Sequence, residues 1–212
     1  MSENCKTIHE IFNSIERHSF SFDENEIPEN GIYILFETGE RAHGNLDRII
    51  RIGTHTGQKQ LRSRLKQHFL NENKDRSIFR KNIGRAILNK AGDDYLPIWE
   101  LDLTTKENKE KYSAIIDRDK QKLIENEITK IMNQNFTFSV IKVEDKESRL
   151  NLESKLISTV SSCKDCFPSN NWLGSFSTKD KIKESGLWLV NELYKEPLND
   201  SDIEKINAII SR

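Results

Sequence analysis

Residues 30–53 read NGIYILFETGERAHGNLDRIIRIG, and the fold that we predict is built around this stretch. Two short runs of apolar, strand-forming residues, 32–36 and 49–52, flank a polar segment that is rich in turn-forming residues. This is the pattern of a β-hairpin with a long loop. Tyr33 on the first strand and Arg51 on the second are expected to project from one face of the hairpin. This face could form part of a catalytic site if the rest of the chain supplies the other functional groups.

The composition indicates a highly charged protein with one hydrophobic core. The chain has 212 residues, of which 32% are charged and 35% hydrophobic. No apolar run approaches the roughly 20 residues that a membrane helix needs, and the first ten residues, MSENCKTIHE, lack the hydrophobic core of a signal peptide. We therefore expect a cytoplasmic protein with no membrane partner, and the sequence gives no indication of its oligomeric state.

Positive charge is concentrated in one segment, residues 59–90, which we call the basic segment. It contains ten Lys and Arg residues against two acidic ones, although the net charge of the chain is only −1. Such an excess is typical of segments that bind phosphate backbones. A solvated helix face explains a basic cluster equally well. The residues predicted to contact nucleic acid are Lys59, Arg62, Lys66, Arg76, Arg80, Lys81 and Arg85.

Apolar periodicity outside the hairpin predicts further strands and several helices. A third main strand is expected over residues 136–143 and a short one at 98–101. Ser201 and Glu204 form a predicted capping box for the last helix. The fold class is α+β, with a small three-stranded mixed or antiparallel sheet flanked by helices and carrying additional helices. The predicted helices cover residues 7–18, 58–69, 77–90, 107–134 (one or two helices), about 145–160 and about 201–210.

Two of the predicted helices carry polar residues beside their apolar stripes. Arg64 and His68 are four residues apart, so their side chains lie next to each other on one side of a helix. Glu153 sits among apolar positions of a later helix. Burying an unpaired carboxylate costs free energy or shifts its pKa. We therefore expect Glu153 at the edge of the stripe, facing solvent or a cleft, and metal binding is one way to hold it there.

These motifs, in this order, resemble the GIY-YIG nuclease family. The resemblance rests on Gly31-Ile32-Tyr33, Arg51-Ile52-Gly53, the arginine helix and the glutamate helix, and it covers most of residues 30–175. It implies a small sheet with flanking helices that hydrolyses DNA phosphodiester bonds. It also implies a nuclease core over residues 30–175, with a charged helical insertion at about 91–135. Residues 1–29 and 176–212 would then be helical extensions.

The resemblance implies roles for individual side chains. Tyr33 matches the tyrosine that activates or positions the attacking water, Arg64 the arginine that steadies the scissile phosphate, and Glu153 the acid that holds a single divalent metal. That metal would be Mg²⁺ or Mn²⁺, since a carboxylate is a hard oxygen ligand. His68 matches a second polar group of the site. Asn171, or its neighbour Asn170, would fill a supporting position.

Arg51 departs from the family pattern, in which the second motif usually supplies a tyrosine. An arginine cannot act as a base near neutral pH, so Arg51 could only bind phosphate or favour the anion of Tyr33. His55, two residues beyond Gly53, is a candidate for the missing proton acceptor. We therefore predict a metal-dependent endonuclease that cleaves DNA rather than RNA. The alternative is a module of the same fold that binds nucleic acid without cleaving it.

The cysteines leave a second alternative open. Cys163 and Cys166 form a Cys-x-x-Cys pair, which raises the question of zinc. Four ligands would require Cys5 or distant imidazoles, because no second pair and no nearby histidine follows. Two loop thiols are therefore the favoured interpretation. His43, in the hairpin loop, has no evident partner in the sequence.

Overall fold

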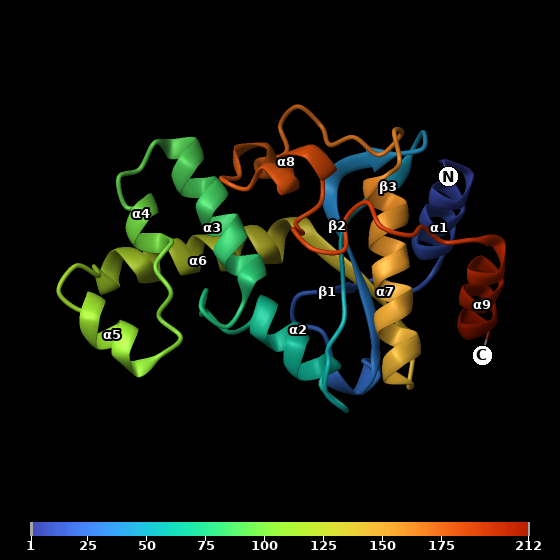
Figure 1. Ribbon diagram of the computed structural model, residues 1–212, viewed down its shortest axis with the longest axis horizontal. Coiled ribbons are helices and arrows are strands. Elements are labelled where there is room, and N and C mark those ends of the chain that lie inside the picture. Colours follow the sequence, from blue (N-terminus) through green and yellow to red (C-terminus); the bar gives the residue numbers. More distant parts are fainter. Residues whose placement is uncertain (1, 212) are drawn as a thin grey trace.

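A four-stranded antiparallel sheet lies at the centre of the computed structural model, which describes residues 2–211 (Figure 1). The strands run in the order β1–β4–β2–β3. The predicted hairpin is β2 (Gly31–Ala42) and β3 (Leu46–Gly53), and β4 (Phe136–Lys142) pairs with the other edge of β2. The α+β prediction and its three strands are confirmed. The additional strand, β1, has only two residues, His18–Ser19.

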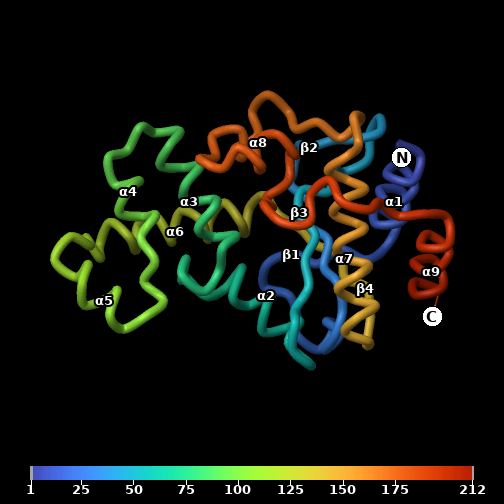
Figure 2. The backbone as a smooth tube through the Cα atoms, viewed as in Figure 1, coloured from blue at the N-terminus to red at the C-terminus, as the bar shows by residue number. Residues whose placement is uncertain are grey.

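Helices cover both faces of this sheet. On one side are α2, α3 and α6, with the short α4 and α5 beyond them, and on the other side are α1, α7 and α9 (Figures 1 and 2). The helices are α1 (Ser2–Ser14), α2 (Leu61–Phe69), α3 (Ile78–Ala91), α4 (Leu96–Trp99), α5 (Lys106–Tyr112), α6 (Arg118–Asn135), α7 (Lys146–Ser161), α8 (Asp180–Ser185) and α9 (Asp200–Ile210), with 3₁₀ turns at Glu24–Glu26 and Leu173–Phe176.

Burial on both faces explains why the first strand of the hairpin is apolar without interruption. Tyr33 and Leu35 point into the core that β2 shares with α2, α3 and α6. Ile32 and Ile34 point into the opposite core, which includes α1, α7 and α9. A strand with one face in water would alternate between apolar and polar residues. Each such fully buried aliphatic side chain stabilises the fold by roughly 1.5–3 kcal/mol.

The short strand predicted at residues 98–101 is wrong, because α4 occupies this region. Pro97 lies in the first turn of α4, where its missing N–H is not needed. Trp99 is fully buried against α3, and its indole nitrogen donates a hydrogen bond to the carbonyl of Lys81 at 3.0 Å. A Cβ atom on Gly84 would lie 2.4 Å from the indole ring, so the glycine makes room for it. Tertiary packing therefore decides this segment.

The last helix forms as predicted, but its cap lies two residues earlier than expected. Asn199 is the N-cap residue, and its side chain accepts a hydrogen bond from the backbone N–H of Asp202 at 3.0 Å. The Asp202 carboxylate accepts one from the Asn199 backbone in return, at 3.2 Å. The reciprocal pair is thus Asn199 and Asp202, and not Ser201 and Glu204. Both pairs have the required spacing, so sequence alone could not separate them.

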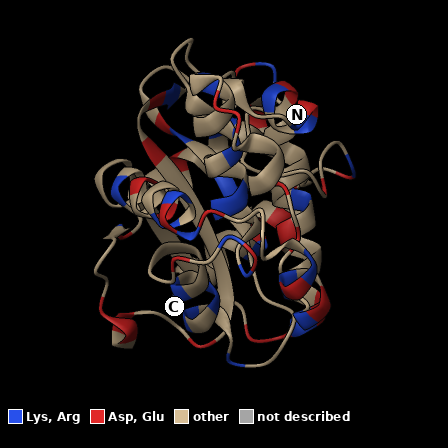
Figure 3. Ribbon diagram, turned by 90° about the vertical axis from the view of Figure 1, so that its left-hand side faces the viewer, with Lys and Arg blue, Asp and Glu red and all other residues tan. Residues whose placement is uncertain are grey.

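The charged region 91–135 forms a helical layer that extends away from the sheet (Figure 1). Figure 3 shows that basic and acidic segments are intermixed on this side of the molecule. At the opposite side, α1 and α9 lie next to each other and contribute Phe12 and Ile206 to the core around β2 and α7. The division at residues 29 and 175 stays a prediction. Within residues 2–211, no helix has the length and apolarity required to cross a bilayer.

Candidate active site

The open end of the hairpin brings Tyr33 and Arg51 together, as the motif predicts. Tyr33 pairs with Gly53 in the register of β2 and β3. A Cβ atom on Gly53 would lie only 2.2 Å from the phenolic oxygen, so a glycine is needed for the phenol to lie across the hairpin. Arg51 projects from the same face, and its Nε donates a hydrogen bond to the phenolic oxygen of Tyr33 at 3.2 Å.

The phenol of Tyr33 also joins a chain of hydrogen bonds that ends in the next helices. Its hydroxyl lies 3.1 Å from Nε2 of His68, and Nδ1 of His68 lies 2.7 Å from the hydroxyl of Ser77. Burial, together with the positive charges of nearby arginines, holds the pKa of His68 well below its usual value. The imidazole is therefore neutral near pH 7. A neutral imidazole accepts at one nitrogen and donates at the other, so this chain can pass a proton between Tyr33 and Ser77.

Arg51 is buried and has several partners. The residue is 4% exposed, and one of its terminal nitrogens donates to the backbone carbonyl of Trp188. The guanidinium carbon also lies 4.8 Å from the centre of the Phe79 ring, within cation–π distance. The residue that replaces the usual tyrosine thus has a defined position between the hairpin and the segment after α8.

Glu153 reaches the same end of the hairpin from the opposite side of the sheet. One of its carboxylate oxygens, Oε1, accepts a hydrogen bond from the backbone N–H of Thr54 at 2.9 Å. Thr54 follows β3 directly and is held by a hydrogen bond from its hydroxyl to the carbonyl of Gly31 at 2.6 Å. Burial raises the pKa of Glu153 to about 7, although the Thr54 hydrogen bond and the charge of Arg51 oppose this shift. A nearby cation would favour its ionised form.

A polar cavity of about 330 Å³ opens beside Thr54. Arg64 lies in its wall, half-buried, and its only side-chain hydrogen bond within residues 2–211 is a long one of 3.4 Å to Gln67. A guanidinium placed in this way can still accept an anionic ligand. The cavity is lined by Thr54, His55, Thr56, Gln60, Ser63, Arg64 and Gln67.

His55 contributes an uncharged acceptor next to this cavity. Its Nδ1 lies 2.8 Å from the carbonyl of Gly57, which it can only reach as a donor, so Nε2 is the acceptor nitrogen. Nε2 is buried and has no hydrogen-bond partner among the described residues. Burial lowers the pKa of His55, which keeps the ring neutral. A buried acceptor without a partner is unusual, and it points to a bound water or ligand at this position.

The donor atoms around Glu153 fit a magnesium-type ion better than a softer metal. Glu153 offers one carboxylate, and the neighbouring cavity adds hydroxyl and amide oxygens. Its second oxygen, Oε2, makes no hydrogen bond to the described residues, and no three-ligand group of His, Cys, Asp and Glu side chains within them includes Glu153. Mg²⁺ typically takes one or two protein carboxylates and keeps several waters. Glu153 alone could therefore hold Mg²⁺ or Mn²⁺.

Asn171 lies elsewhere. It is exposed and lines a different cavity, together with Glu37, Lys90 and Leu173. The reason is the neighbouring Trp172, which is buried and donates a hydrogen bond from its indole nitrogen to Glu37 at 3.0 Å. This anchor holds the loop against α3, away from Glu153. A supporting role for Asn171 at the metal site has no basis in this geometry.

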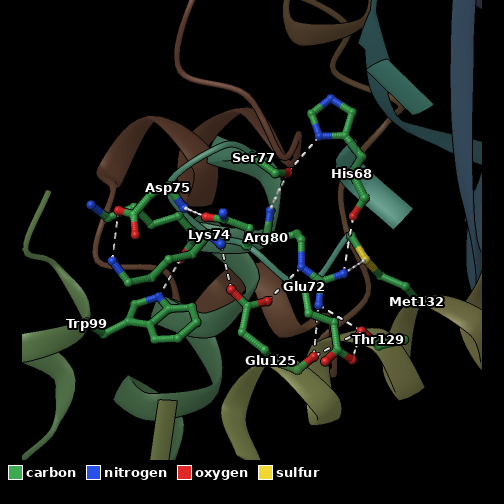
Figure 4. Close-up of polar contacts among 12 residues, drawn as sticks. His68, Glu72, Lys74, Asp75, Ser77, Arg80, Trp99, Glu125, Thr129 and Met132 are labelled. Carbon is green, nitrogen blue, oxygen red and sulfur yellow. Dashed lines mark hydrogen bonds and ion pairs between the residues drawn. The ribbon is translucent and has the colours of Figure 1, made fainter. Parts of the chain in front are cut away.

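The second half of the basic segment is buried, so the expectation that Arg80 faces solvent is wrong. Arg80 is fully buried, and its Nε donates to the carboxylate of Glu125 at 2.7 Å (Figure 4). Its other nitrogens reach the hydroxyl of Thr129 at 2.7 Å and the backbone carbonyl of His68 at 3.3 Å. Arg80 thus fastens α6 to α3 and supports the backbone of His68. It cannot also bind a phosphate.

Lys81 and Arg85 are buried as well, which corrects the prediction that they form a nucleic-acid surface. The Lys81 ammonium donates to the backbone carbonyl of Glu100 at 2.8 Å, and Arg85 forms an ion pair with the carboxylate of Glu100 at 2.6 Å. Both side chains bind the segment after α4 to α3. The helical periodicity of the sequence could not show this, because the covering layer is formed by residues that follow later in the chain.

The remaining residues of the basic segment are closer to solvent, but most of them have partners. Lys59 and Lys66 form ion pairs of 3.0 Å with Glu29 and Glu24. Arg62 donates to the backbone carbonyl of Ile27 at 2.7 Å. Arg76 is exposed, directly before the Ser77 cap. The positive surface available to a nucleic acid is therefore smaller than the sequence predicts.

Several residues of the site carry no motif of their own. Thr54 could have been found from its place directly after the Arg-Ile-Gly motif. Gln60 and Gln67 lie four and three residues from Arg64, on the same side of the helix, and Ser63 lies next to Arg64 in the cavity wall. Ser77 shows a cap signal but no sign of its contact with His68. The Trp188 carbonyl is a backbone group, and no sequence pattern marks it.

Comparison with known proteins shows the family of this chain. The sequence model of the GIY-YIG domain matches residues 5–212, which is nearly the whole chain. No curated protein and no solved structure matches it significantly. The match includes the hairpin, the arginine helix and the glutamate helix, whose side chains meet at one end of the sheet. The chain therefore belongs to the GIY-YIG domain family, whose members are nucleases that act on nucleic acid.

Proposed function

We propose that this protein is a metal-dependent endonuclease that hydrolyses DNA phosphodiester bonds. The observation that carries the proposal is the convergence of Tyr33, Arg64 and Glu153 at one end of the hairpin, from three different elements and from both faces of the sheet. Phosphodiester hydrolysis requires a proton acceptor, cationic groups around the phosphate and a ligand for a divalent ion. Arg64 lines the polar cavity, Glu153 is hydrogen-bonded to Thr54 at the edge of this cavity, and Tyr33 lies buried at the same end of the hairpin.

Each side chain has a task that its position supports. Arg64 in the cavity wall would stabilise the negative charge that grows on the phosphate oxygens during attack. The attacking water must lose a proton as its oxygen bonds to phosphorus and the bond to the leaving sugar oxygen breaks. Tyr33 would take part in this transfer through its hydrogen bond to the neutral His68, and His55 offers a second acceptor. Glu153 would hold Mg²⁺ or Mn²⁺, which when bound lowers the pKa of water and stabilises the leaving oxygen.

The test is cleavage of supercoiled plasmid with Mg²⁺, Mn²⁺ or EDTA. We expect nicked and linear products only when the metal is present, and a loss of at least about 100-fold in Glu153→Gln. Glu147→Gln is the matched control, because Glu147 is an exposed acid of the same helix. Cleavage by Glu153→Gln at the wild-type rate would refute the proposal. RNA of the same sequence, used as a competitor, tests the preference for DNA.

A second candidate function is a module that binds DNA without cleaving it. Two observations favour it: Arg51 stands where the family usually has a tyrosine, and the side chain of Tyr33 is only 1% exposed and already hydrogen-bonded inside the protein. Retardation of DNA in a gel, with no cleavage under any metal condition, would support this function over the enzyme.

A further inference from the structure

A cluster of thiols and imidazoles that the proposed cleavage does not use lies at the closed end of the hairpin. It joins three parts of the chain: Cys5 on α1, His43 in the turn between β2 and β3, and Cys163 and Cys166 after α7. In Figure 1 these segments meet near the N-terminal end of the chain. The hydroxyl of Ser2 also contacts the carboxylate of Asp165, which holds α1 against the cysteine loop. The sequence shows no partner for His43, and in the structure its imidazole lies beside a group of thiols.

Several atoms of this cluster lie at nearly the spacing of ligands around one metal ion. The sulfurs of Cys5 and Cys166 are 3.4 Å apart, and Nε2 of His43 lies 3.1 Å from the sulfur of Cys166 and 3.8 Å from that of Cys163. In a regular tetrahedral zinc site, ligand atoms are separated by roughly 3.6–3.8 Å, given Zn–S and Zn–N bonds of about 2.3 and 2.0 Å. These three ligand–ligand distances thus lie within about half an ångström of this arrangement.

His9 is a fifth candidate ligand that lies close to the cluster, but both of its ring nitrogens already have hydrogen-bond partners. One ligand atom each from Cys5, His9, His43 and Cys166 lies within 4.8 Å of the others. However, Nε2 of His9 accepts a hydrogen bond from the backbone N–H of Ile49 at 3.1 Å, and its Nδ1 lies 2.8 Å from the carbonyl of Cys5. Both ring nitrogens therefore have backbone partners. His9 positions the Cys5 end of α1, and Cys163 is the better fourth ligand.

The cysteines of the cluster are available to a metal ion as thiols. The three cysteines are buried, none forms a disulfide, and Cys5 is 0% exposed. Several thiols packed this closely in a protein core stabilise little by themselves. A shared cation explains why they lie together.

We propose that Cys5, His43, Cys163 and Cys166 form a structural zinc site that fastens α1, the hairpin turn and the loop after α7 to one another. Three cysteines and one histidine are a common tetrahedral set for structural zinc, and they leave no open coordination position for a substrate. Zinc binding would displace the remaining thiol protons into the solvent. The site is distinct from the candidate active site, because His43 and Tyr33 are ten residues apart on the hairpin, roughly 30 Å along a strand.

The experiment begins with metal analysis of the full-length protein, purified under reducing conditions without added metal. We expect one zinc per chain. Replacement by Co²⁺ should give the visible bands of a tetrahedral ion and the near-ultraviolet thiolate bands. Cys163→Ser and His43→Ala should each weaken zinc binding at least about tenfold, whereas Lys164→Gln, an exposed change in the same loop, should keep it.

Two further measurements keep the proposal testable if a cysteine variant does not fold. His43→Cys should still bind one metal and should strengthen the thiolate bands of Co²⁺, because it converts the site to four sulfurs. Glu153→Gln should bind zinc as the wild type does, so a failure of the proposed nuclease and a failure of the zinc site give different results. A reduced protein that contains no zinc and takes up no Co²⁺ would overturn the proposal. Unchanged zinc affinity in both Cys163→Ser and His43→Ala would do the same.

Discussion

At the open end of the hairpin, Glu153 keeps one carboxylate oxygen free of hydrogen bonds to the described residues, and Arg64 lies half-buried in a cavity wall. At the closed end, Cys5 and Cys166 are buried and in contact with each other and with imidazoles. The first end offers fewer protein ligands than an ion needs, whereas the second holds the four side chains that we propose as zinc ligands. This is the difference expected between a site that must admit a substrate and one that only joins elements.

The two ends also differ in what their burial costs. Glu153 is held in a position that raises its pKa to about 7, so its ionised form is disfavoured by the fold. At the closed end the shifts run in both directions: the contact with Cys166 and burial raise the pKa of Cys5, burial raises that of Cys163, and the hydrogen bond from Cys5 lowers that of Cys166. An unfavourable charge is typical of functional sites, because a ligand supplies the missing partner. Variants that alter one end should therefore leave the other unchanged, and the following predictions test this separation from the largest expected effect to the smallest.

The largest effect is expected from Arg64→Ala. Loss of the guanidinium removes charge stabilisation of the phosphate, which typically costs 10²–10³ in rate, or about 2.7–4 kcal/mol. The melting temperature and the zinc content should remain those of the wild type, because Arg64 has only a long contact to Gln67. Single-turnover cleavage of a labelled duplex measures the rate. A loss of less than about threefold would remove Arg64 from the proposed mechanism.

Much of the open end could be predicted from the sequence, because its residues follow recognisable motifs. Tyr33 and Arg51 share a face as strand geometry requires, and Arg64 and His68 share one side of α2. Glu153 lies at the edge of its apolar stripe, where a carboxylate avoids full burial. The sequence could not show that α7 packs where Glu153 reaches the backbone of Thr54. That depends on which face of the sheet each helix covers.

The closed end could not be predicted, because its ligands come from separated segments. Cys5 and His43 lie in different elements, and Cys163 is more than a hundred residues away from both. A Cys-x-x-Cys pair alone is weak evidence for zinc. The buried arginine Arg80 illustrates the same limit, since periodicity places it on a polar helix face and only the later α6 covers it. Long-range packing, rather than local pattern, decides both cases.

The next largest effect concerns the closed end, and it depends on the proposed zinc site. Cys163→Ser should lower the free energy of unfolding by about 3 kcal/mol, or roughly 6–12 °C in melting temperature, because a metal ligand is lost. Cleavage at 20 °C should stay within about twofold of the wild type. Thermal unfolding followed by circular dichroism measures the first effect. Loss of cleavage in a protein that remains folded would contradict the independence of the two ends.

A smaller effect is expected from the pH dependence of stability in Glu153→Gln. The pKa of Glu153 is raised to about 7 from an ordinary value of 4.5, so the folded state binds its proton more tightly than the unfolded state. Its contribution to stability is full below pH 4.5 and is lost as the pH rises through 7. Glutamine does not titrate. The variant should nearly match the wild type at pH 4.5 and exceed it by roughly 2–3 kcal/mol at pH 8, since a pKa difference of about 2.5 corresponds to at most about 3.4 kcal/mol.

Urea unfolding at the two pH values measures this difference, with Glu147→Gln as the exposed control on the same helix. Adding Mg²⁺ at pH 8 should stabilise the wild type and not Glu153→Gln, because only the carboxylate gains a cation. A variant that is less stable than the wild type at pH 8 would mean that the carboxylate is a structural group. Glu153 would then resemble the residues of the closed end.

The smallest effect is expected from Arg76→Ala, which tests how far the open end extends toward a nucleic acid. Arg76 is exposed next to the Ser77 cap, so it can reach a phosphate without contributing to the cavity. Its removal should weaken DNA binding by less than about 1 kcal/mol. It should also reduce the slope of the logarithm of the binding constant against the logarithm of the salt concentration by about 1. Lys6→Ala, an exposed change on α1 at the closed end, should alter neither. Equal effects of the two variants on binding, measured by fluorescence anisotropy at several salt concentrations, would show that DNA does not distinguish the two ends.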